Sequence, residues 1–445
     1  MKDGLAALLK ERALEQGFGL AGIAEVRESD HADFLRDWLA AGYHGEMAYL
    51  ARPDAVARRA DPRRQAGDPR TDASDPRTHA GDLRSALVVA DFYPADGEEP
   101  DRAVADSRDR APVRRPDNPS TGVIARYARG RDYHRVVKGK LRRLLRWLEG
   151  EVGRPLPAAR ACVDTSPVLE RELARRAGIG WFGRNTMLIH PRRGSYFFLG
   201  VLLTELDLEP DAPFEPDHCG TCRACLDACP TGALLGRDEN GAPVMDARLC
   251  ISYLTIEHRG PIPPELRPAI GNRVFGCDIC QEVCPFPRKF SRPTSEPSFA
   301  ARAPGEPPSG VERIDSDVWH PGTSSPSLVD LLAMTLDEAS WESFSRGSAV
   351  RRAGRSGLAR NVCVGLGNWG SPDAVPVLTR ALSDEEPLVR AHAAWALGRV
   401  GSSAAADVLS TALESEEDVF VREELESALG AHCPARSRGE RSDRS

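Results

Sequence analysis

The sequence of 445 residues lacks any long uninterrupted apolar run. A membrane-spanning helix needs roughly 18 or more consecutive apolar residues, and no segment approaches that length. The first residues, MKDGLAALLKERALEQG, are charged throughout and lack the continuous apolar stretch of a secretory signal peptide. We therefore expect a cytoplasmic protein that has no membrane partner and keeps its thiols reduced.

The sequence also lacks an overall excess of positive charge, since its formal net charge is −7. A negative total argues against general attraction to nucleic acid, but a sum over the chain hides local patches. Residues 122–148 hold nine Lys or Arg against one acid, Asp132, and residues 345–360 hold five Arg and no acid. These two basic stretches are candidate surfaces for a nucleic-acid backbone; the alternative is that both are solvated helix faces.

Cysteine, by contrast, is concentrated, because eight of the eleven cysteines lie between positions 219 and 284. Two runs share this region, CGTCRACLDACP from position 219 and CDICQEVCP from position 277, and each ends in Cys-Pro. In proteins with two [4Fe–4S] clusters, three close cysteines bind one cluster and the fourth, before proline, ligates the other. We therefore predict a first cluster bound by Cys219, Cys222, Cys225 and Cys284, and a second bound by Cys229, Cys250, Cys277 and Cys280.

Two other uses of these cysteines fit the spacing less well. Zinc sites usually show two separated Cys-x2-Cys pairs and close with four ligands. Disulfides need an oxidising compartment, which the missing export signal argues against. Two adjacent low-potential clusters form a one-electron relay, so the sequence predicts redox work.

The N-terminal half reads as alternating strands and helices, which indicates an α/β domain. Residues 61–82 and 94–120 are polar insertions rich in Asp, Arg and Pro. Ser166 and Pro167 predict the N-cap and first position of a helix that ends near Arg176. The hydrophobic periodicity predicts helices over residues 2–16, 31–41 and 133–148, and strands over residues 86–93, 160–164 and 195–206.

The C-terminal region contains an internal repeat, in which a Leu-Gly pair recurs at residues 366–367, 397–398 and 429–430. A period of about 30 residues with two helices per unit is typical of a short HEAT-type α-solenoid. The sequence therefore predicts an α+β multidomain protein. We expect an α/β domain over residues 1–215, a ferredoxin-like domain over 216–290, a Pro/Ser-rich linker with a helix over 291–345, a HEAT-like repeat over 346–434 and a disordered tail over 435–445.

Four segments of the sequence resemble the epoxyqueuosine reductase family: RYARGRDYH (126–134), DTSPVLERELARRAGIGWFGRNT (164–186), CISYLTIE (250–257) and GNRVFGCDICQEVCP (271–285). The resemblance covers nearly the whole chain. It implies a cobalamin-binding domain related to nitroreductase and reductive dehalogenase folds, a ferredoxin module with two [4Fe–4S] clusters, and a helical repeat that grips tRNA. The implied reaction is the last step of queuosine biosynthesis, in which epoxyqueuosine at the anticodon wobble position is reduced to queuosine.

The resemblance implies that Asp164 is the proton donor of this reaction. A free aspartic acid has a pKa of about 3.9, so we expect burial to raise the pKa of Asp164. The alternative is that Asp164 only hydrogen-bonds the backbone of a turn.

The family pattern implies cobalamin contacts at Arg59, Ala125, Asp164, Leu188, Leu199, Ser252, Cys277 and Asp278. For the first of these contacts, the neighbouring Arg58 is the alternative to Arg59.

His134 follows Asp132 in an Asp-x-His pattern similar to that of enzymes that bind cobalt through histidine. Those enzymes require glycine three residues after the histidine, and this sequence has Val137 there. We therefore expect His134 to be a surface or phosphate-contacting residue and not a cobalt ligand.

The expected partners are a tRNA anticodon stem-loop with a GUN anticodon and an unidentified low-potential electron donor, and we expect a monomer. The resemblance implies tRNA contacts at Arg259, Arg351, Arg352 and Arg355.

Three other functions remain open at this point: a reductive dehalogenase with the same cofactors, a ferredoxin-like electron carrier, and a binding protein with structural clusters. A reductive dehalogenase usually carries a twin-arginine export signal, and an electron carrier leaves the N-terminal domain unexplained.

Overall fold

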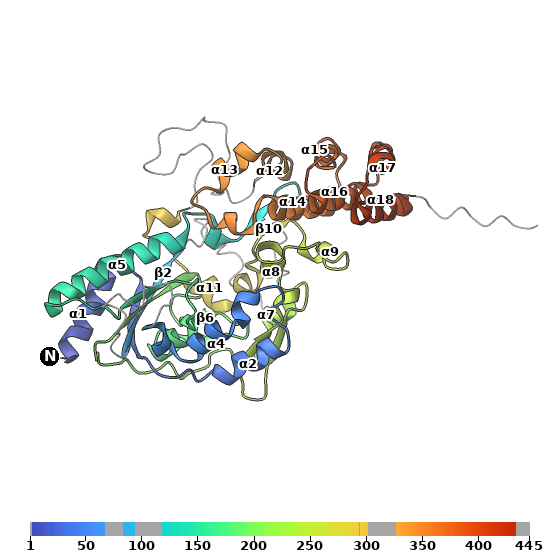
Figure 1. Ribbon diagram of the computed structural model, residues 1–445. Helices are drawn as coiled ribbons and strands as arrows, with labels where there is room; N and C mark the ends of the chain where they lie inside the picture. The colour runs from blue at the N-terminus through green and yellow to red at the C-terminus, as the bar shows by residue number, and fades with distance from the viewer. Residues whose placement is uncertain (1, 67–82, 94–117, 293, 301–325, 433–445) are drawn as a thin grey trace, which may run out of the picture.

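The computed structural model describes residues 2–66, 83–93, 118–292, 294–300 and 326–432 (Figure 1). Most of the two predicted insertions (67–82 and 94–117) and the predicted C-terminal tail lie outside the described residues. Within the described ranges, every helix is too short or too polar to cross a membrane.

A four-stranded sheet forms the centre of the N-terminal domain. Its order is β1 (Leu20–Glu25), β2 (Ser85–Phe92), β7 (Phe197–Thr204) and β4 (Arg160–Cys162). Every neighbouring pair is antiparallel, in keeping with the predicted α+β class; the strand directions themselves were not predicted from the sequence. β2 and β7 are almost entirely buried, which explains why both read as nearly continuous apolar runs in the sequence.

Helices cover both faces of this sheet (Figure 1). α1 (Lys2–Glu15) and α5 (Tyr133–Val152) pack on one face, where their apolar side chains join those of β2 and β7. α6 (Glu170–Arg176) packs on the other face. The predicted N-cap at Ser166 is wrong, because α6 begins at Glu170 and Ser166 lies in the preceding turn. The domain also contains α2 (Ala32–Ala40), α3 (Ala48–Ala51), α4 (Pro53–Ala60), β5 (Trp181–Phe182) and β6 (Leu188–Ile189).

The cysteine-rich region consists of short elements connected by loops. β10 (Arg273–Phe275) pairs in parallel with β3 (Val123–Ile124), which ties this region to the segment that leads into α5. Two of its helices begin directly after a cysteine, α8 (Ile251–Ile256) after Cys250 and α11 (Pro285–Phe290) after Cys284. The other elements are α7 (Ala224–Ala228), β8 (Leu234–Arg237), β9 (Pro243–Met245), α9 (Arg267–Ile270) and α10 (Ile279–Glu282).

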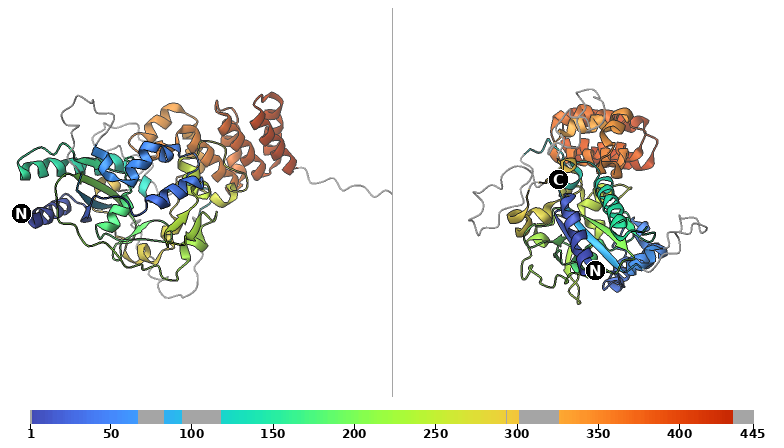
Figure 2. Two further views of the ribbon diagram at one scale, coloured as in Figure 1. Left: turned by 60° about the horizontal axis from the view of Figure 1, so that its bottom comes forward. Right: turned by 90° about the vertical axis from the view of Figure 1, so that its left-hand side faces the viewer.

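The C-terminal helices stack as an α-solenoid, which extends from one side of the molecule (Figure 2). The repeated glycines explain the stacking, because a Cβ on Gly367 would lie 2.5 Å from Trp395 and one on Gly398 would lie 2.8 Å from Ala428 Cβ. α12 and α13 share the solenoid core, so helical packing begins within the segment predicted as a linker. The helices are α12 (Leu328–Thr335), α13 (Glu338–Ser345), α14 (Arg355–Trp369), α15 (Val375–Ala381), α16 (Pro387–Val400), α17 (Ser403–Ser415) and α18 (Val419–His432).

Buried polar contacts attach the solenoid to the cysteine-rich region. Arg360 of α14 is only 1% exposed and donates hydrogen bonds to the carbonyl oxygens of Leu254, His258 and Gly260. Burial lowers the pKa of the Arg360 guanidinium to about 9. The neighbouring Asn361 donates to the carbonyl oxygens of Thr255 and Val274. A buried arginine that donates hydrogen bonds to three carbonyl oxygens fixes the orientation of the solenoid relative to the cysteine-rich region.

Candidate functional site

The structure brings the eight predicted cluster ligands together in two sets. A cavity of about 30 Å³ is lined by four cysteines from both runs. In the described part of the chain, no three Cys, His, Asp or Glu side chains converge as ligands of a single metal ion. The cysteines around this cavity are those predicted for the first cluster: Cys219, Cys222, Cys225 and Cys284.

The second set lies next to the first. Burial raises the pKa of the Cys280 thiol well above its usual value, and the nearby thiols of Cys277, Cys250 and Cys225 raise it further. Burial likewise raises the pKa of the Cys250 thiol, and the nearby Cys229 raises it further. Since such interactions fall off with distance, Cys229, Cys250, Cys277 and Cys280 form one group, and Cys225 links it to the other set. Two adjacent sets of this kind are what electron transfer between two clusters requires.

Asp164 lies just beyond the end of β4, at the open edge of the sheet. β4 pairs with β7 only from Arg160 to Cys162. Two further steps of that antiparallel register would place Asp164 opposite Leu199 of β7, but the chain turns away in a left-handed conformation, with φ +51° at Asp164. Its side chain is 62% exposed. A strained, non-glycine residue at a strand end is frequently a functional one.

His134 connects Asp164 to Asp132. Nε2 of His134 lies 3.1 Å from Oδ2 of Asp164, and Nδ1 lies 2.7 Å from Oδ1 of Asp132. Asp132 also caps α5 by accepting a hydrogen bond from the backbone N–H of His134. The sequence predicts His134 as a surface or phosphate-contacting residue, and the structure adds a contact with the predicted proton donor that the sequence did not indicate. The ring of Tyr133 stacks on that of His134, with centroids 4.0 Å apart.

The protonation states in this group differ from those expected. Desolvation raises the pKa of Asp164, but the hydrogen bond and positive charge of His134 outweigh it, so the net shift is downward. The expected net rise of this pKa is therefore wrong, although burial does act in that direction. Desolvation lowers the pKa of His134, and its hydrogen bonds to Asp132 and Asp164 more than compensate, so that the pKa rises to about 9. At neutral pH the pair is a carboxylate and an imidazolium.

The residues expected to contact cobalamin come from several segments of the N-terminal domain and the cysteine-rich region. Arg59 is buried whereas Arg58 is half-buried. Burial lowers the pKa of Arg59, and the charge of Asp164 acts in the opposite direction. Leu188 and Leu199 belong to one apolar group on the face of the sheet away from α5. Ser252 and Cys277 are half-buried in the cysteine-rich region.

Ala125 and Asp278 lie beside this group. The backbone N–H of Ala125 donates to the carbonyl oxygen of Phe275 at 2.8 Å. The backbone N–H of Arg126 donates to Oδ2 of the buried Asp278 at 2.8 Å. Burial raises the pKa of Tyr127 well above its usual value, and the charges of Asp164 and Asp278 both raise it further. Tyr127 therefore lies between the sheet edge and the cysteine-rich region.

The four predicted tRNA contacts already have partners within the chain. Arg259 donates to the carbonyl oxygens of Ala353 and Arg352. The other three pair with carboxylates: Arg351 with Glu342, Arg352 with Glu257 and Arg355 with Asp384.

α5 offers cations that are not used in this way. Lys138, Arg142 and Arg146 follow His134 at intervals of four residues and so form one row on the helix surface, termed here the α5 row. Arg142 and Arg146 are exposed and Lys138 is half-exposed. Among the described residues, none of the three has a hydrogen bond or ion pair with another side chain. The sequence identified this basic stretch but not the row that leads away from His134.

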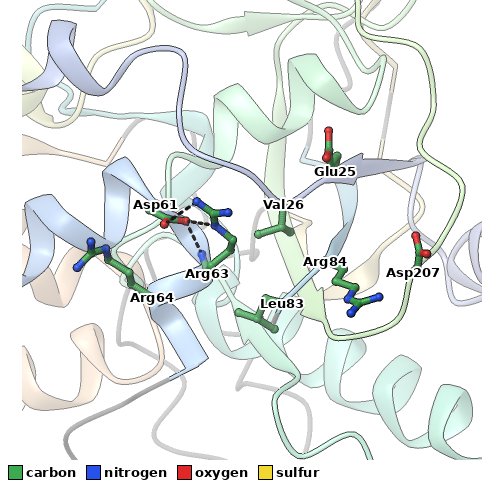
Figure 3. A pocket seen from close by; sticks show the side chains of 8 residues that line it. All are labelled: Glu25, Val26, Asp61, Arg63, Arg64, Leu83, Arg84 and Asp207. Atoms are coloured by element: carbon green, nitrogen blue, oxygen red, sulfur yellow. Dashed lines mark hydrogen bonds and ion pairs between the residues drawn. The ribbon is translucent and has the colours of Figure 1, made fainter. Parts of the chain in front are cut away.

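A larger cavity of about 630 Å³ lies elsewhere, next to the segment that precedes β2 (Figure 3). Its lining is polar and of mixed charge, and Arg63 is bonded to Asp61 within it. None of the residues predicted for catalysis, cofactors or tRNA lines this cavity, so it is separate from the site around Asp164.

Comparison with family models divides the chain in a similar way. A model described as a 4Fe-4S double cluster binding domain matches residues 218–287, and a model described as HEAT repeats matches residues 347–430. A third model, described as "Epoxyqueuosine reductase QueG, DUF1730", matches residues 74–165.

Whole-chain relatives extend the similarity. The epoxyqueuosine reductase of Pseudomonas aeruginosa is 38% identical over 90% of this chain and 95% of its own length. That of Escherichia coli is 35% identical over 89% of each chain. A crystal structure of epoxyqueuosine reductase with an epoxyqueuosine-modified tRNA-Tyr stem loop superimposes with a TM-score of 0.75 at 29% identity, covering 96% of this chain and 99% of that one. A Bacillus subtilis epoxyqueuosine reductase, solved with its catalytic aspartate loop swung out of the active site, gives 0.72 at 28% identity over 96% and 99%.

Proposed function

The chain belongs to the epoxyqueuosine reductase family, and we propose that it reduces the epoxide of epoxyqueuosine at the wobble position of tRNA to the alkene of queuosine. The observation that carries this proposal is the position of Asp164. Its exposed carboxylate lies at the open end of β4, with Oδ2 3.1 Å from Nε2 of a charged histidine. A structural aspartate that only closes a turn has no need of such a partner.

The residues around Asp164 suit the cofactors of this family. The two sets of four cysteines would hold the two [4Fe–4S] clusters, and the half-exposed Leu199, with Leu188 behind it, offers an apolar surface next to polar groups for cobalamin. When bound, cobalamin supplies a strongly reducing cobalt centre to which the clusters pass electrons one at a time. His134 is held by two carboxylates, which supports a cobalt without a histidine ligand from the protein.

The chemistry explains why an acid is needed at this position. Reduction of an epoxide to an alkene consumes two electrons and two protons and releases the oxygen as water. Asp164 delivers the protons to that oxygen as general acid. Desolvation already raises its pKa, but the hydrogen bond and charge of His134 outweigh this and keep the pKa below its usual value. Bound cofactor and nucleoside cover the exposed carboxylate, and the resulting desolvation raises its pKa toward the value that a donor needs.

The tRNA binds between the solenoid and α5. The backbone N–H of Asp132 at the start of α5 donates to the carbonyl oxygen of Gly347 in the C-terminal region, and α5 runs away from the solenoid (Figure 1). The α5 row then contacts backbone phosphates, while the modified nucleoside leaves its stack to reach Asp164. The solved relative with a bound tRNA stem loop supports this substrate class. The protein acts as a cytoplasmic monomer on tRNAs with GUN anticodons and takes electrons from a low-potential carrier.

One assay tests this function. Anaerobically purified protein with intact clusters is mixed with cobalamin, a strong reductant and tRNA that bears epoxyqueuosine. The tRNA is then digested, and its nucleosides are separated and identified by mass spectrometry. We expect queuosine to form, and we expect the Asp164→Asn variant to lower the rate by about 10²–10⁴-fold. Asp33→Asn, an exposed aspartate on α2, is the matched control. A wild-type protein that holds clusters and cobalamin but forms no queuosine would refute the proposal.

A further inference from the structure

The reaction needs two protons, and Asp164 can hold only one at a time. After the first transfer the carboxylate must be reloaded while the nucleoside covers it. A group that reloads Asp164 must touch it from the protein side, carry a proton near neutral pH and reach solvent. His134 meets all three conditions, since Nε2 lies 3.1 Å from Asp164 and the side chain is 29% exposed.

The hydrogen bonds of His134 fix its charge. A neutral imidazole has one N–H and can donate to only one partner. Both ring nitrogens of His134 face carboxylate oxygens, that of Asp132 at 2.7 Å and that of Asp164 at 3.1 Å. Since ionised carboxylates only accept hydrogen bonds, the ring satisfies both contacts only as an imidazolium. The raised pKa of about 9 agrees with this geometry.

We propose that His134 reloads Asp164 with each of the two protons and that Asp132 keeps the imidazole charged. The proposal rests on the function proposed above. In each cycle Nε2–H of His134 protonates the Asp164 carboxylate, Asp164 gives that proton to the substrate oxygen, and the ring regains its proton from solvent. The first proton accompanies cleavage of one C–O bond, and the second accompanies departure of the oxygen as water. The reductant supplies the two electrons, so epoxide, two electrons and two protons give alkene and water.

The other groups that face His134 suit this role. On its own helix are Asp132 and Tyr133, and the ring of Tyr133 stacks on the imidazole. Opposite lies Asp164, and from α6 the carboxyl group of Glu170 interacts with the imidazole charge. Lys138 lies one turn further along α5. Burial raises the pKa of Glu170 to about 8, and the charge of Asp164 adds to this shift. Glu170 is therefore neutral at pH 7, and Asp132 and Asp164 are the two anions that hold the imidazolium.

The test compares single-turnover rates of wild type, His134→Ala, Asp132→Asn and Asp164→Ala with epoxyqueuosine tRNA. We expect His134→Ala to lower the rate by about 10²–10⁴-fold without changing the KM for tRNA. Added imidazole and substituted imidazoles should restore activity to His134→Ala, with rates that follow their pKa values. A residue that only orients Asp164 would show no such dependence. Asp132→Asn should shift the alkaline limb of the rate profile to lower pH, because the ring loses an anionic partner.

Controls keep the outcomes separate. His31→Ala removes a histidine that contacts Glu172 outside this group and should behave as wild type, and the visible absorption of the clusters verifies that each variant is folded. The proposed proton transfer from His134 to Asp164 would be overturned if the rate of His134→Ala were within about threefold of wild type. It would also be overturned if His134→Ala were folded but added imidazoles did not restore its activity. If wild type itself forms no queuosine, the proposed function fails. If Asp164→Ala is inactive and His134→Ala is active, the proposed function stands and only the proton transfer from His134 is refuted.

Discussion

The backbone N–H of Asp164 donates a hydrogen bond of 2.6 Å to Oε1 of Glu170, six residues further along the chain. This bond closes the turn in which Asp164 has φ +51°, so a side chain from the start of α6 helps to hold the proposed proton donor in an unfavourable backbone conformation. Desolvation raises the pKa of Glu170 to about 8, and the charge of Asp164 adds to that shift.

Glu170→Gln should alter the pH dependence of stability. A carboxyl group whose pKa is higher in the folded than in the unfolded protein binds protons more tightly when folded. Its contribution to stability is therefore full below the unfolded pKa of about 4.5 and declines as the pH rises toward 8. Glutamine keeps the acceptor oxygen but does not titrate. We expect the Tm of the variant, relative to wild type, to rise between pH 5 and pH 8, about the interval between these two pKa values.

Thermal unfolding in a series of buffers checks this prediction. The matched control is Glu11→Gln, an exposed glutamate of α1, for which the difference from wild type should stay constant across the same pH range. A constant difference for Glu170→Gln as well would mean that this carboxyl group is ionised in the folded protein.

Each cysteine run should supply its last cysteine, the one before proline, to the cluster that the other run mainly binds. If Cys284 ligates the first cluster and Cys229 the second, Cys284→Ala and Cys222→Ala should each lose the first cluster and leave the same residual paramagnetic resonance signal after reduction. Cys229→Ala and Cys277→Ala should share the other signal. Iron content should fall from about eight to about four atoms per chain in each case. Cys363→Ala removes a buried solenoid thiol and serves as control. If Cys284→Ala instead matched Cys277→Ala, each run would hold its own cluster.

The sequence allowed the elements of this fold to be predicted better than their partners. Apolar periodicity gave α5 and β7 nearly correctly because both depend on residues close in sequence. The antiparallel order of the sheet depends on contacts between distant segments, which no local pattern encodes. For the same reason the contact between His134 and Asp164 was missed, since these residues are 30 positions apart.

The basic residues illustrate the same limit. A run of arginines in the sequence does not reveal which of them find carboxylates in the folded chain. Arg355 is paired with Asp384, which lies 29 residues away on another repeat, whereas Arg142 has no partner among the described residues. Charge counts alone therefore pointed to two basic stretches and could not separate structural from free cations.

Arg355 and Arg351 should differ in their effect on stability. Arg355 makes two hydrogen bonds to Asp384, whose side chain is only 5% exposed. Removal of the guanidinium takes both charged hydrogen bonds from this buried carboxylate and leaves it the backbone N–H of Glu386, so we expect Arg355→Ala to lower the free energy of unfolding by about 1–3 kcal/mol. The pair between Arg351 and Glu342 is exposed on both sides, so Arg351→Ala should leave stability unchanged. Urea unfolding of both variants would measure this, and equal midpoints would contradict the assignment of Arg355 as structural.

The α5 row should carry a salt-dependent part of tRNA affinity. Each cation that neutralises a phosphate releases a counterion, so loss of one contact lowers the slope of log affinity against log salt by about 0.7–0.9. The triple variant Lys138→Ala, Arg142→Ala, Arg146→Ala should therefore bind tRNA with a slope that is smaller by about 2–3. Its KM for tRNA should rise while the rate at saturating tRNA stays near that of wild type. Arg36→Ala, an exposed arginine on α2 that pairs with Asp33, should change neither quantity. A slope equal to that of wild type would show that the row is a solvated helix face.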